Sequence, residues 1–169
     1  MLIQEKIGNL ATFPTDGRTI DRLSLEWYET SKRILRKHTD AKQEVALRFL
    51  NENPALTEDD VLYADDRTII AITILPCDAM VIPMGAPETI ASACYEIGNR
   101  HLPLFIDKTQ LLAPFEEPLF RWLTANGYNP AREQRKLIQP LRSTVAAHAH
   151  SGAGSSLFSK ILQLTTPRP

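Results

Sequence analysis

The sequence predicts an α+β protein: a small antiparallel β domain at the N-terminus, then a ferredoxin-like βαββαβ domain, then a flexible C-terminal tail. Apolar and polar residues alternate as in strands over residues 1–75, whereas residues 76–142 interleave strands with two helical stretches. Residues 143–169 open with small and polar residues that bury too little surface to fold by themselves. We therefore expect three units with these boundaries.

The N-terminal domain is predicted from a period of two residues. The stretches DRLSLEW and EVALRFL, residues 21–27 and 44–50, each alternate apolar and polar side chains, and Trp27 is the last apolar residue of the first. Further strands are expected at residues 61–63 and over the β-branched run at residues 68–75.

The first half of the second domain is predicted to run strand, helix, strand. DAMVIPM is short and apolar, as a buried strand is. The helix is expected to begin at Pro87, because the first turn needs no N–H from that residue, and Glu88 suits the positive end of the helix dipole. LPLFID then forms the next strand.

The second half is predicted to run strand, helix, strand. QLLAPF forms a strand, and Pro118 marks the first turn of a second helix that ends at a left-handed pair, Asn126 and Gly127. We expect the last strand within residues 135–141. This order of elements is that of the ferredoxin-like fold.

Composition argues against several classes of protein. The 19 basic and 20 acidic residues give a net charge of -1, which does not favour a phosphate-binding face, so no nucleic-acid partner is expected. The apolar runs are far shorter than the roughly 20 residues of a membrane helix, and no signal peptide is visible. Two cysteines are not a disulfide framework, so we expect a cytoplasmic protein.

Signatures of catalysis are missing from the sequence. It contains no GxSxG, HExxH, Walker or GxGxxG pattern, so we expect a protein that is not an enzyme and has no catalytic residues. Cys77 and Cys94 lack CxxC spacing, and we interpret both as inert thiols.

His101, in the stretch CYEIGNRHLPLF, has three possible roles. It continues the helical stripe of Ile90 and Ile97, which is the pattern of a core-facing residue. Gly98 and Pro103 instead indicate that the helix ends before His101, which would make it a cap residue or an exposed metal ligand. The residues alone leave these alternatives open.

A metal site would need donors beyond one histidine. A neutral imidazole suits Ni, Cu or Zn, and a two-fold dimer would bring one His101 from each chain to the same ion. His148 and His150, in AAHAHSG, stand one residue apart in the tail, where an HxH pair could add ligands. Chance placement in a solvated tail is the alternative for this pair. His38, in LRKHTD, is interpreted as a surface residue.

The stretch CYEIGNRHLPLF resembles the signature of the UreE family of urease accessory proteins. The match centres on Tyr95 and on GNRH, residues 98–101. The segments LEW, KRILRKHT and TEDDVLYADDRTIIAI also resemble the N-terminal domain of that family, so that the resemblance covers roughly residues 1–142.

The resemblance implies a cytoplasmic metallochaperone that delivers Ni(II) to apo-urease. It implies a homodimer formed through the ferredoxin-like domains, in which His101 of each chain binds one shared nickel ion and His148 and His150 add ligands. It also implies that the N-terminal domain binds partners, namely the urease accessory GTPase and the complex of urease with its accessory proteins before activation. Zinc or copper are expected to bind in vitro, because copper lies above nickel in affinity and zinc lies close to it.

The sequence departs from the family pattern in its turns and its tail. Many members have a glycine in the hairpin occupied here by residues 40–42, and another at the position of Asp59. Many also end in a long polyhistidine tail, whereas this chain has only HxH, so we expect one or two ions per dimer.

Two other functions fit a ferredoxin-like domain. One is an RNA-binding module, which would use exposed aromatic residues such as Phe105 and Phe115 on the sheet. The other is a dimeric scaffold without a metal, in which His101 belongs to the core.

Overall fold

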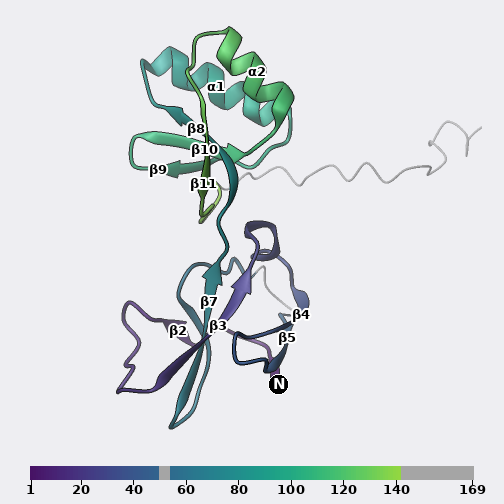
Figure 1. Cartoon of the computed structure of the whole chain (residues 1–169), viewed down its shortest axis with the longest axis vertical. Coiled ribbons are helices and arrows are strands. Elements are labelled where there is room, and N and C mark those ends of the chain that lie inside the picture. The colour runs from purple at the N-terminus through teal and green to yellow at the C-terminus, as the bar shows by residue number, and fades with distance from the viewer. Residues whose placement is uncertain (50–53, 142–169) are drawn as a thin grey trace, which may run out of the picture.

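The computed structural model describes residues 1–49 and 54–141. Figure 1 shows two domains, joined by the short segment between β7 (Thr68–Ile74) and β8 (Cys77–Pro83). The predicted fold class, α+β with a βαββαβ unit in the second domain, is confirmed. Within the described ranges, no helix has the length and apolar character needed to span a membrane.

The N-terminal domain contains two sheets, with strand orders β2-β6-β7-β3 and β1-β5-β4. Its remaining strands are β1 (Leu2–Ile3), β2 (Gly8–Asn9), β3 (Thr19–Leu25), β4 (Ile34–His38), β5 (Glu44–Arg48) and β6 (Asp60–Ala64). The prediction of a wholly antiparallel domain needs correction, because β3 runs parallel to β7 and β1 runs parallel to β5. After β3 the chain crosses to the other sheet and returns through β6, whose hairpin with β7 sets β7 parallel to β3.

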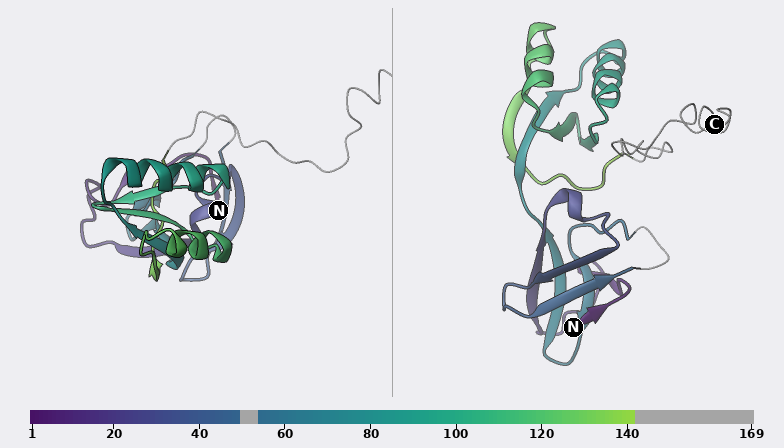
Figure 2. Two further views of the ribbon diagram at one scale, coloured as in Figure 1. Left: turned by 90° about the horizontal axis from the view of Figure 1, so that it is seen from above. Right: turned by 90° about the vertical axis from the view of Figure 1, so that its right-hand side faces the viewer.

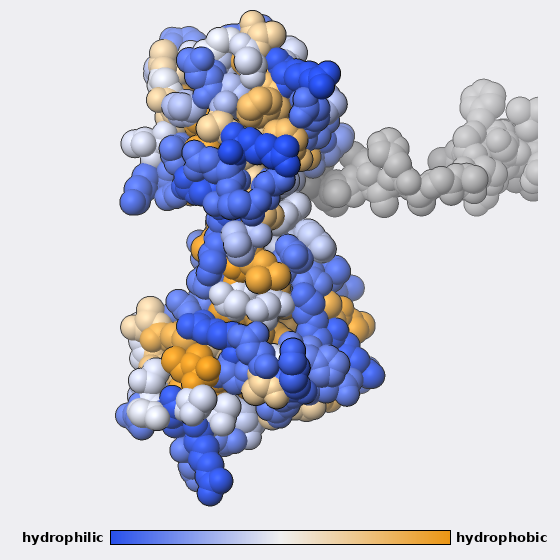
Figure 3. Space-filling view, in the orientation of Figure 1, coloured by the Kyte–Doolittle hydropathy of each residue, from blue (hydrophilic) through white to orange (hydrophobic). Residues whose placement is uncertain are grey.

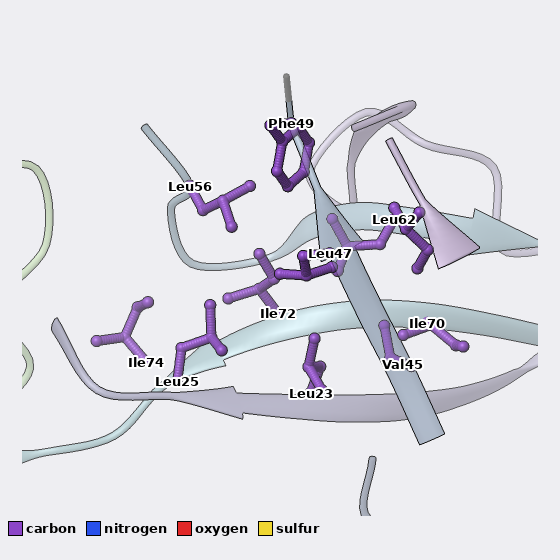
Figure 4. Close-up of a cluster of buried hydrophobic side chains, with 11 residues drawn as sticks. Leu23, Leu25, Val45, Leu47, Phe49, Leu56, Leu62, Ile70, Ile72 and Ile74 are labelled. Carbon is purple, nitrogen blue, oxygen red and sulfur yellow. The ribbon is translucent and has the colours of Figure 1, made fainter. Parts of the chain in front are cut away.

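The core of the N-terminal domain lies between these two sheets. Figure 4 shows the inward side chains of β3 and β7 meeting those of β5. The alternation predicted for β3 and β5 is confirmed, since Leu23, Leu25 and Val45 are fully buried and Leu47 is 2% exposed. Burial of these branched side chains is the main stabilisation of the domain.

Trp27 does not belong to the preceding strand, contrary to the prediction. It begins a short 3-10 helix, η1 (Trp27–Glu29), in which the Glu29 carboxylate accepts the Glu26 backbone N–H at 2.9 Å. Glu29 also lies 2.5 Å from the Lys37 ammonium. These bonds turn the chain at the end of β3 and direct Trp27 toward the second domain.

The second domain is a four-stranded antiparallel sheet of order β11-β8-β10-β9. Its other elements are α1 (Pro87–Asn99), β9 (Phe105–Asp107), β10 (Gln110–Pro114), α2 (Glu117–Ala125) and β11 (Ala131–Arg135). Figure 2 shows both helices on the face of the sheet that points away from the N-terminal domain. Pro87 and Pro118 both lie in first turns, as predicted.

Three predicted elements of this domain differ in the structure. The last strand is β11, not residues 135–141: it is an edge strand with four of its five residues exposed, so it has no apolar alternation to detect. In LPLFID only Phe105–Asp107 pairs, because Pro103 has no N–H to donate. At the end of α2 only Gly127 is left-handed, with φ 80°, while Asn126 has φ -99°.

The two domains are joined by packing and by the ammonium of Lys136, which donates to Glu58 and Thr73 of the N-terminal domain. The rings of Trp27 and Phe105 meet edge to face, with centroids 6.1 Å apart, and Leu137 is buried beside them. The ammonium of Lys136, in the second domain, donates to the carboxylate of Glu58, in the N-terminal domain, at 2.8 Å. Residues 136–141, which were predicted to belong to the last strand, instead form a strap that runs along the junction.

Two turns have a left-handed residue where a glycine is common in the resembled family. Lys42 has φ 66° and Asp59 has φ 64°. Such a conformation costs a residue with a side chain about 1 kcal/mol or more. At Asp59 an ion pair with Arg22, at 2.6 Å, offsets part of that cost.

Glu58 is expected to make the domain junction sensitive to acid. Burial of its carboxyl group raises the pKa, but hydrogen bonds from Lys136, the Ile74 backbone and Thr73 outweigh it, so the pKa lies below the ordinary 4.5. A lowered pKa stabilises the fold above the unfolded-state pKa, and that stabilisation is lost as the pH falls through the folded-state pKa.

We therefore expect Glu58→Gln to lower the free energy of unfolding in urea by about 0.5 to 1 kcal/mol at pH 7. The difference from the parent should shrink as the pH falls below 4.5. Glu5→Gln, at an exposed position with no ion pair among the described residues, is the matched control. A gap between parent and Glu58→Gln that stays constant down to about pH 3 would contradict the assignment.

Candidate metal-binding site

Helix α1 ends in a closed backbone motif that places His101. Arg100 caps the helix, and His101 follows it with φ 56°. The His101 N–H donates to the Gly98 carbonyl at 2.9 Å, and the Leu102 N–H donates to the Ile97 carbonyl at 3.3 Å. This pair of bonds is the Schellman motif, with His101 at the left-handed position after the cap.

An apolar contact locks this turn. Ile97 is fully buried, and Leu102 packs against the same core cluster, which is the hydrophobic pair that commonly accompanies a Schellman motif. Pro103 then keeps the chain from returning to a helix. The backbone at His101 is therefore fixed on both sides.

His101 is exposed and does not join the core. The helical stripe that includes Ile97 does not extend to it, because the left-handed turn rotates the side chain away from the helix axis. The alternative in which His101 packs in the core is therefore wrong, and the helix end indicated by Gly98 and Pro103 is confirmed. The exposed imidazole has two nitrogens, of which one can bind a metal in the neutral form.

The left-handed backbone conformation at His101 costs conformational energy for any residue other than glycine. Glycine is the usual occupant of this place in a Schellman motif, because it has no Cβ to clash with the backbone. Histidine tolerates the left-handed region better than most residues but is still strained there. Among the described residues, seven others with side chains also have a positive φ, so the function of His101 is argued from its exposed imidazole and not from the strain alone.

The surface around His101 is partly polar and partly open. The Arg100 guanidinium lies 3.9 Å from the carboxylate of Glu116, which also accepts the Leu119 N–H at 3.0 Å and so caps α2. Tyr95 is 70% exposed, and a Cβ added to Gly98 would meet no described atom within 4 Å apart from its chain neighbours and the backbone of its own helix. This face of α1 is therefore uncovered next to His101.

Glu116 was not singled out from the sequence. Glu116 is the N-cap residue, directly before the first helical residue Glu117. Glutamate is not one of the residues usually found at an N-cap, so the sequence carries little signal for this role. The pairing of Glu116 with Arg100 ties the end of α1 to the start of α2, and no sequence spacing shows that contact.

The other candidate donors lie away from His101 or cannot be placed. His38 is exposed at the end of β4. Burial raises the pKa of both Cys77 and Cys94, which keeps these half-buried thiols protonated and supports their interpretation as inert. His148 and His150 lie outside the described residues. In residues 1–49 and 54–141, no three His, Cys, Asp or Glu side chains are grouped so that they could hold a metal ion.

Comparison with known proteins matches most of the chain to the two domains of one family. Residues 3–75 match the model of the UreE urease accessory protein N-terminal domain, and residues 78–156 match the C-terminal domain model. A urease accessory protein UreE of Flavobacterium johnsoniae is 46% identical over 164 residues, which cover 97% of this chain and 99% of that protein. The UreE protein of Haemophilus influenzae is 43% identical over 150 residues, which cover 86% of this chain and 80% of that protein. The UreE protein of Helicobacter pylori is 33% identical over 150 residues, which cover 86% of this chain and 88% of that protein.

The strained turn predicts that His101→Gly stabilises the protein. Glycine relieves the left-handed conformation but adds freedom to the unfolded chain, so we expect the free energy of unfolding to rise by about 0.5 to 1 kcal/mol. His101→Val should lower it by about 1 kcal/mol or more, because a β-branched residue fits this conformation poorly. Urea denaturation measures both changes. A loss of stability in His101→Gly would show that the imidazole makes stabilising contacts instead.

Proposed function

We infer the role of this chain from the premise that it belongs to the UreE urease accessory protein family. Members of this family are nickel chaperones for urease maturation and are not enzymes. The chain is therefore a urease accessory protein, and nickel is the cargo that it carries.

Our proposal for the site is a homodimer in which the two copies of His101 bind one Ni(II) ion between them. The observation that supports it most strongly is the exposed imidazole on a fixed, strained turn, beside a face of α1 that the described chain leaves uncovered. Contact between two such faces, related by a two-fold axis, would bring the two imidazoles together. The protruding Tyr95 would supply apolar area to that contact.

A site of this composition suits a protein that must release its ion. Structural metal sites enclose the ion with a full set of protein ligands, usually four. Two imidazoles at a subunit contact supply only half of such a set, and the remaining positions stay open to water, to the tail or to a receiving protein. Zinc and copper should bind to the same imidazoles in vitro.

The tail begins close enough to His101 to contribute ligands. The Leu141 N–H donates to the Leu104 carbonyl at 2.7 Å, so the chain leaves the described structure beside the segment that follows His101. From Leu104 back to His101 is at most about 11 Å of extended chain, and from Leu141 to His148 the chain reaches about 25 Å. His148 and His150 are therefore within reach of the ion, and we propose them as its auxiliary ligands.

The division of labour that we propose follows the three units of the chain. Residues 76–142 bind the metal and dimerise, residues 143–169 form the histidine-containing tail, and residues 1–75 bind partners. Those partners are the urease accessory GTPase and the complex of urease with its accessory proteins, met in the cytoplasm. Family membership supports a place in the urease accessory machinery at large.

The RNA-binding alternative is disfavoured by the domain junction. A ferredoxin-like sheet binds single strands through aromatic rings on its open face. Here Phe105 is 1% exposed and packs against Trp27, and Leu137 is buried in the same cluster. The face that would stack bases is covered by the N-terminal domain and the strap.

Nickel binding by His101→Gly tests the shared site, and equilibrium dialysis at pH 7.5 measures it. We expect the variant to lose the tightest nickel site while staying folded, because only the ligand is removed. His101→Asn, which also tolerates the left-handed turn, should lose the same site, and His38→Ala should bind as the parent does. Parental affinity in His101→Gly would refute the proposal.

Truncation of the chain after Val145 tests the tail. It removes His148 and His150 but leaves the His101 pair, so nickel binding should weaken by about tenfold, within the range seen for loss of auxiliary groups, without disappearing. The double variant His148→Ala/His150→Ala should reproduce the effect. An unchanged dialysis curve for both proteins would remove the tail from the site.

A further inference from the structure

We propose that Arg100 keeps nickel binding at His101 weak enough for the ion to be passed on. Its guanidinium places a positive charge next to the ligand, and the carboxylate of Glu116 offsets only part of that charge. This inference rests on the metal site proposed above. It adds a residue that sets the affinity of that site through its charge, without touching the ion.

Arg100 is held directly beside His101. It caps helix α1, and its N–H donates to the Ile97 carbonyl at 3.2 Å, so the backbone carrying the side chain is fixed. The Cα atoms of neighbouring residues are about 3.8 Å apart. In the dimer that we propose, an ion bound by two copies of His101 therefore has two copies of Arg100 near it.

The contact that compensates the Arg100 charge is loose. Nη1 of Arg100 lies 3.9 Å from Oε2 of Glu116, beyond the roughly 2.7 to 3.2 Å of a hydrogen bond. The same oxygen accepts the Leu119 N–H at 3.0 Å as the cap of α2. The two side chains of the pair are 33% and 34% exposed, so water weakens their attraction. Glu116 therefore neutralises Arg100 only in part.

A second carboxylate has the spacing to pair with Arg100 but does not reach it. Glu96 precedes Arg100 by four residues, a spacing at which glutamate and arginine attract each other on a helix. Among the residues that the structure describes, Glu116 is nevertheless the one acidic group within 4 Å of the Arg100 guanidinium. Most of the positive charge is therefore left beside the His101 turn.

A positive charge at this place opposes the binding of a divalent cation. At 0.01 M salt the Debye length is about 30 Å, which exceeds the reach of two neighbouring side chains, so the charge acts on the ion with little screening. Figure 3 shows many hydrophilic residues at the surface of the second domain, and Arg100 itself is exposed. Water therefore keeps the repulsion moderate, and added salt should remove most of it.

A simpler role for Arg100 is to stabilise the end of α1. The last turn of a helix carries partial negative charge, which favours a cation there. This role predicts that a neutral residue at position 100 lowers stability in urea and leaves nickel affinity unchanged. The proposed role predicts instead a change in nickel affinity whose size depends on salt.

Nickel dialysis of the full-length chain at pH 7.5 distinguishes the two roles. We expect Arg100→Gln to bind nickel about fivefold more tightly than the parent at 0.01 M salt, and less than about twofold more tightly at 0.5 M. Arg100→Lys keeps the charge and should bind as the parent does. Unchanged or weaker binding by Arg100→Gln at the lower salt would overturn the proposal. So would an Arg100→Lys variant that behaves like Arg100→Gln.

Glu116→Gln changes the charge in the opposite direction. It should weaken nickel binding at 0.01 M salt by at least about twofold, because it removes the negative charge beside Arg100. The double variant Arg100→Gln/Glu116→Gln should return toward the affinity of the parent. Unchanged or tighter binding by Glu116→Gln would contradict the proposed compensation.

An exposed pair of the same composition in the N-terminal domain is the matched control. Arg36 and Glu44 lie 3.3 Å apart on the neighbouring strands β4 and β5. Arg36→Gln and Glu44→Gln change the net charge of the chain by the same amounts as the test variants, and they should leave nickel affinity unchanged. Shifts equal to those of the test variants would show that net charge matters and position does not, which would overturn the proposal.

Two further measurements separate the possible failures. Arg100→Gln should tighten zinc binding by about the same factor as nickel binding, because the two ions carry the same charge. Tightening for nickel alone would indicate altered ligand geometry and would overturn the charge argument. If His101→Gly loses the nickel site while Arg100→Gln binds as the parent does, this inference fails and the proposed function stands. If His101→Gly binds nickel as the parent does, the proposed function itself fails.

Discussion

The placement of the His101 imidazole, and with it the proposed metal site, depends on how helix α1 ends. The Schellman bonds from His101 to Gly98 and from Leu102 to Ile97 fix an imidazole outside the core at a backbone position that favours glycine. The domain tolerates that strain because Ile97 and Leu102 anchor the turn in a packed cluster. A ligand held this way keeps its orientation without a cage of other ligands, which is what a protein that binds and then releases an ion requires.

Other parts of the fold lie where they could add ligands to the single imidazole of this turn, and they fix the position of the N-terminal domain. In the dimer that we propose, the uncovered face of α1 would meet its copy so that a second imidazole lies beside the first. The strap brings Leu141 beside Leu104, a few residues beyond His101. The contacts of Trp27 with Phe105, and of Glu58 with Lys136, hold the N-terminal domain against the open face of the sheet. The N-terminal domain, for which we propose partner binding, is therefore held in a fixed position relative to the sheet of the second domain.

The sequence predicted the elements whose signals are local. Pro87 and Pro118 fixed the helix starts, and alternation identified β3 and β5, while Gly98 and Pro103 indicated the helix end at His101. Signals of longer range were missed. The exposed edge strand β11 carries no apolar pattern, Trp27 leaves its strand because of bonds to Glu29, and the Arg100–Glu116 pair joins two helices. The left-handed conformation of His101 was also not predicted, because glycine is the residue that usually indicates such a conformation and histidine is not.

The most direct test is a crystal structure of the nickel-loaded, full-length protein with anomalous data collected at the nickel edge. The account predicts one strong peak on a two-fold axis, with an imidazole nitrogen of His101 from each chain about 2.0 to 2.2 Å from it, near the usual metal–imidazole distance. Nickel bound elsewhere, with the two His101 rings facing solvent on separate surfaces, would contradict it.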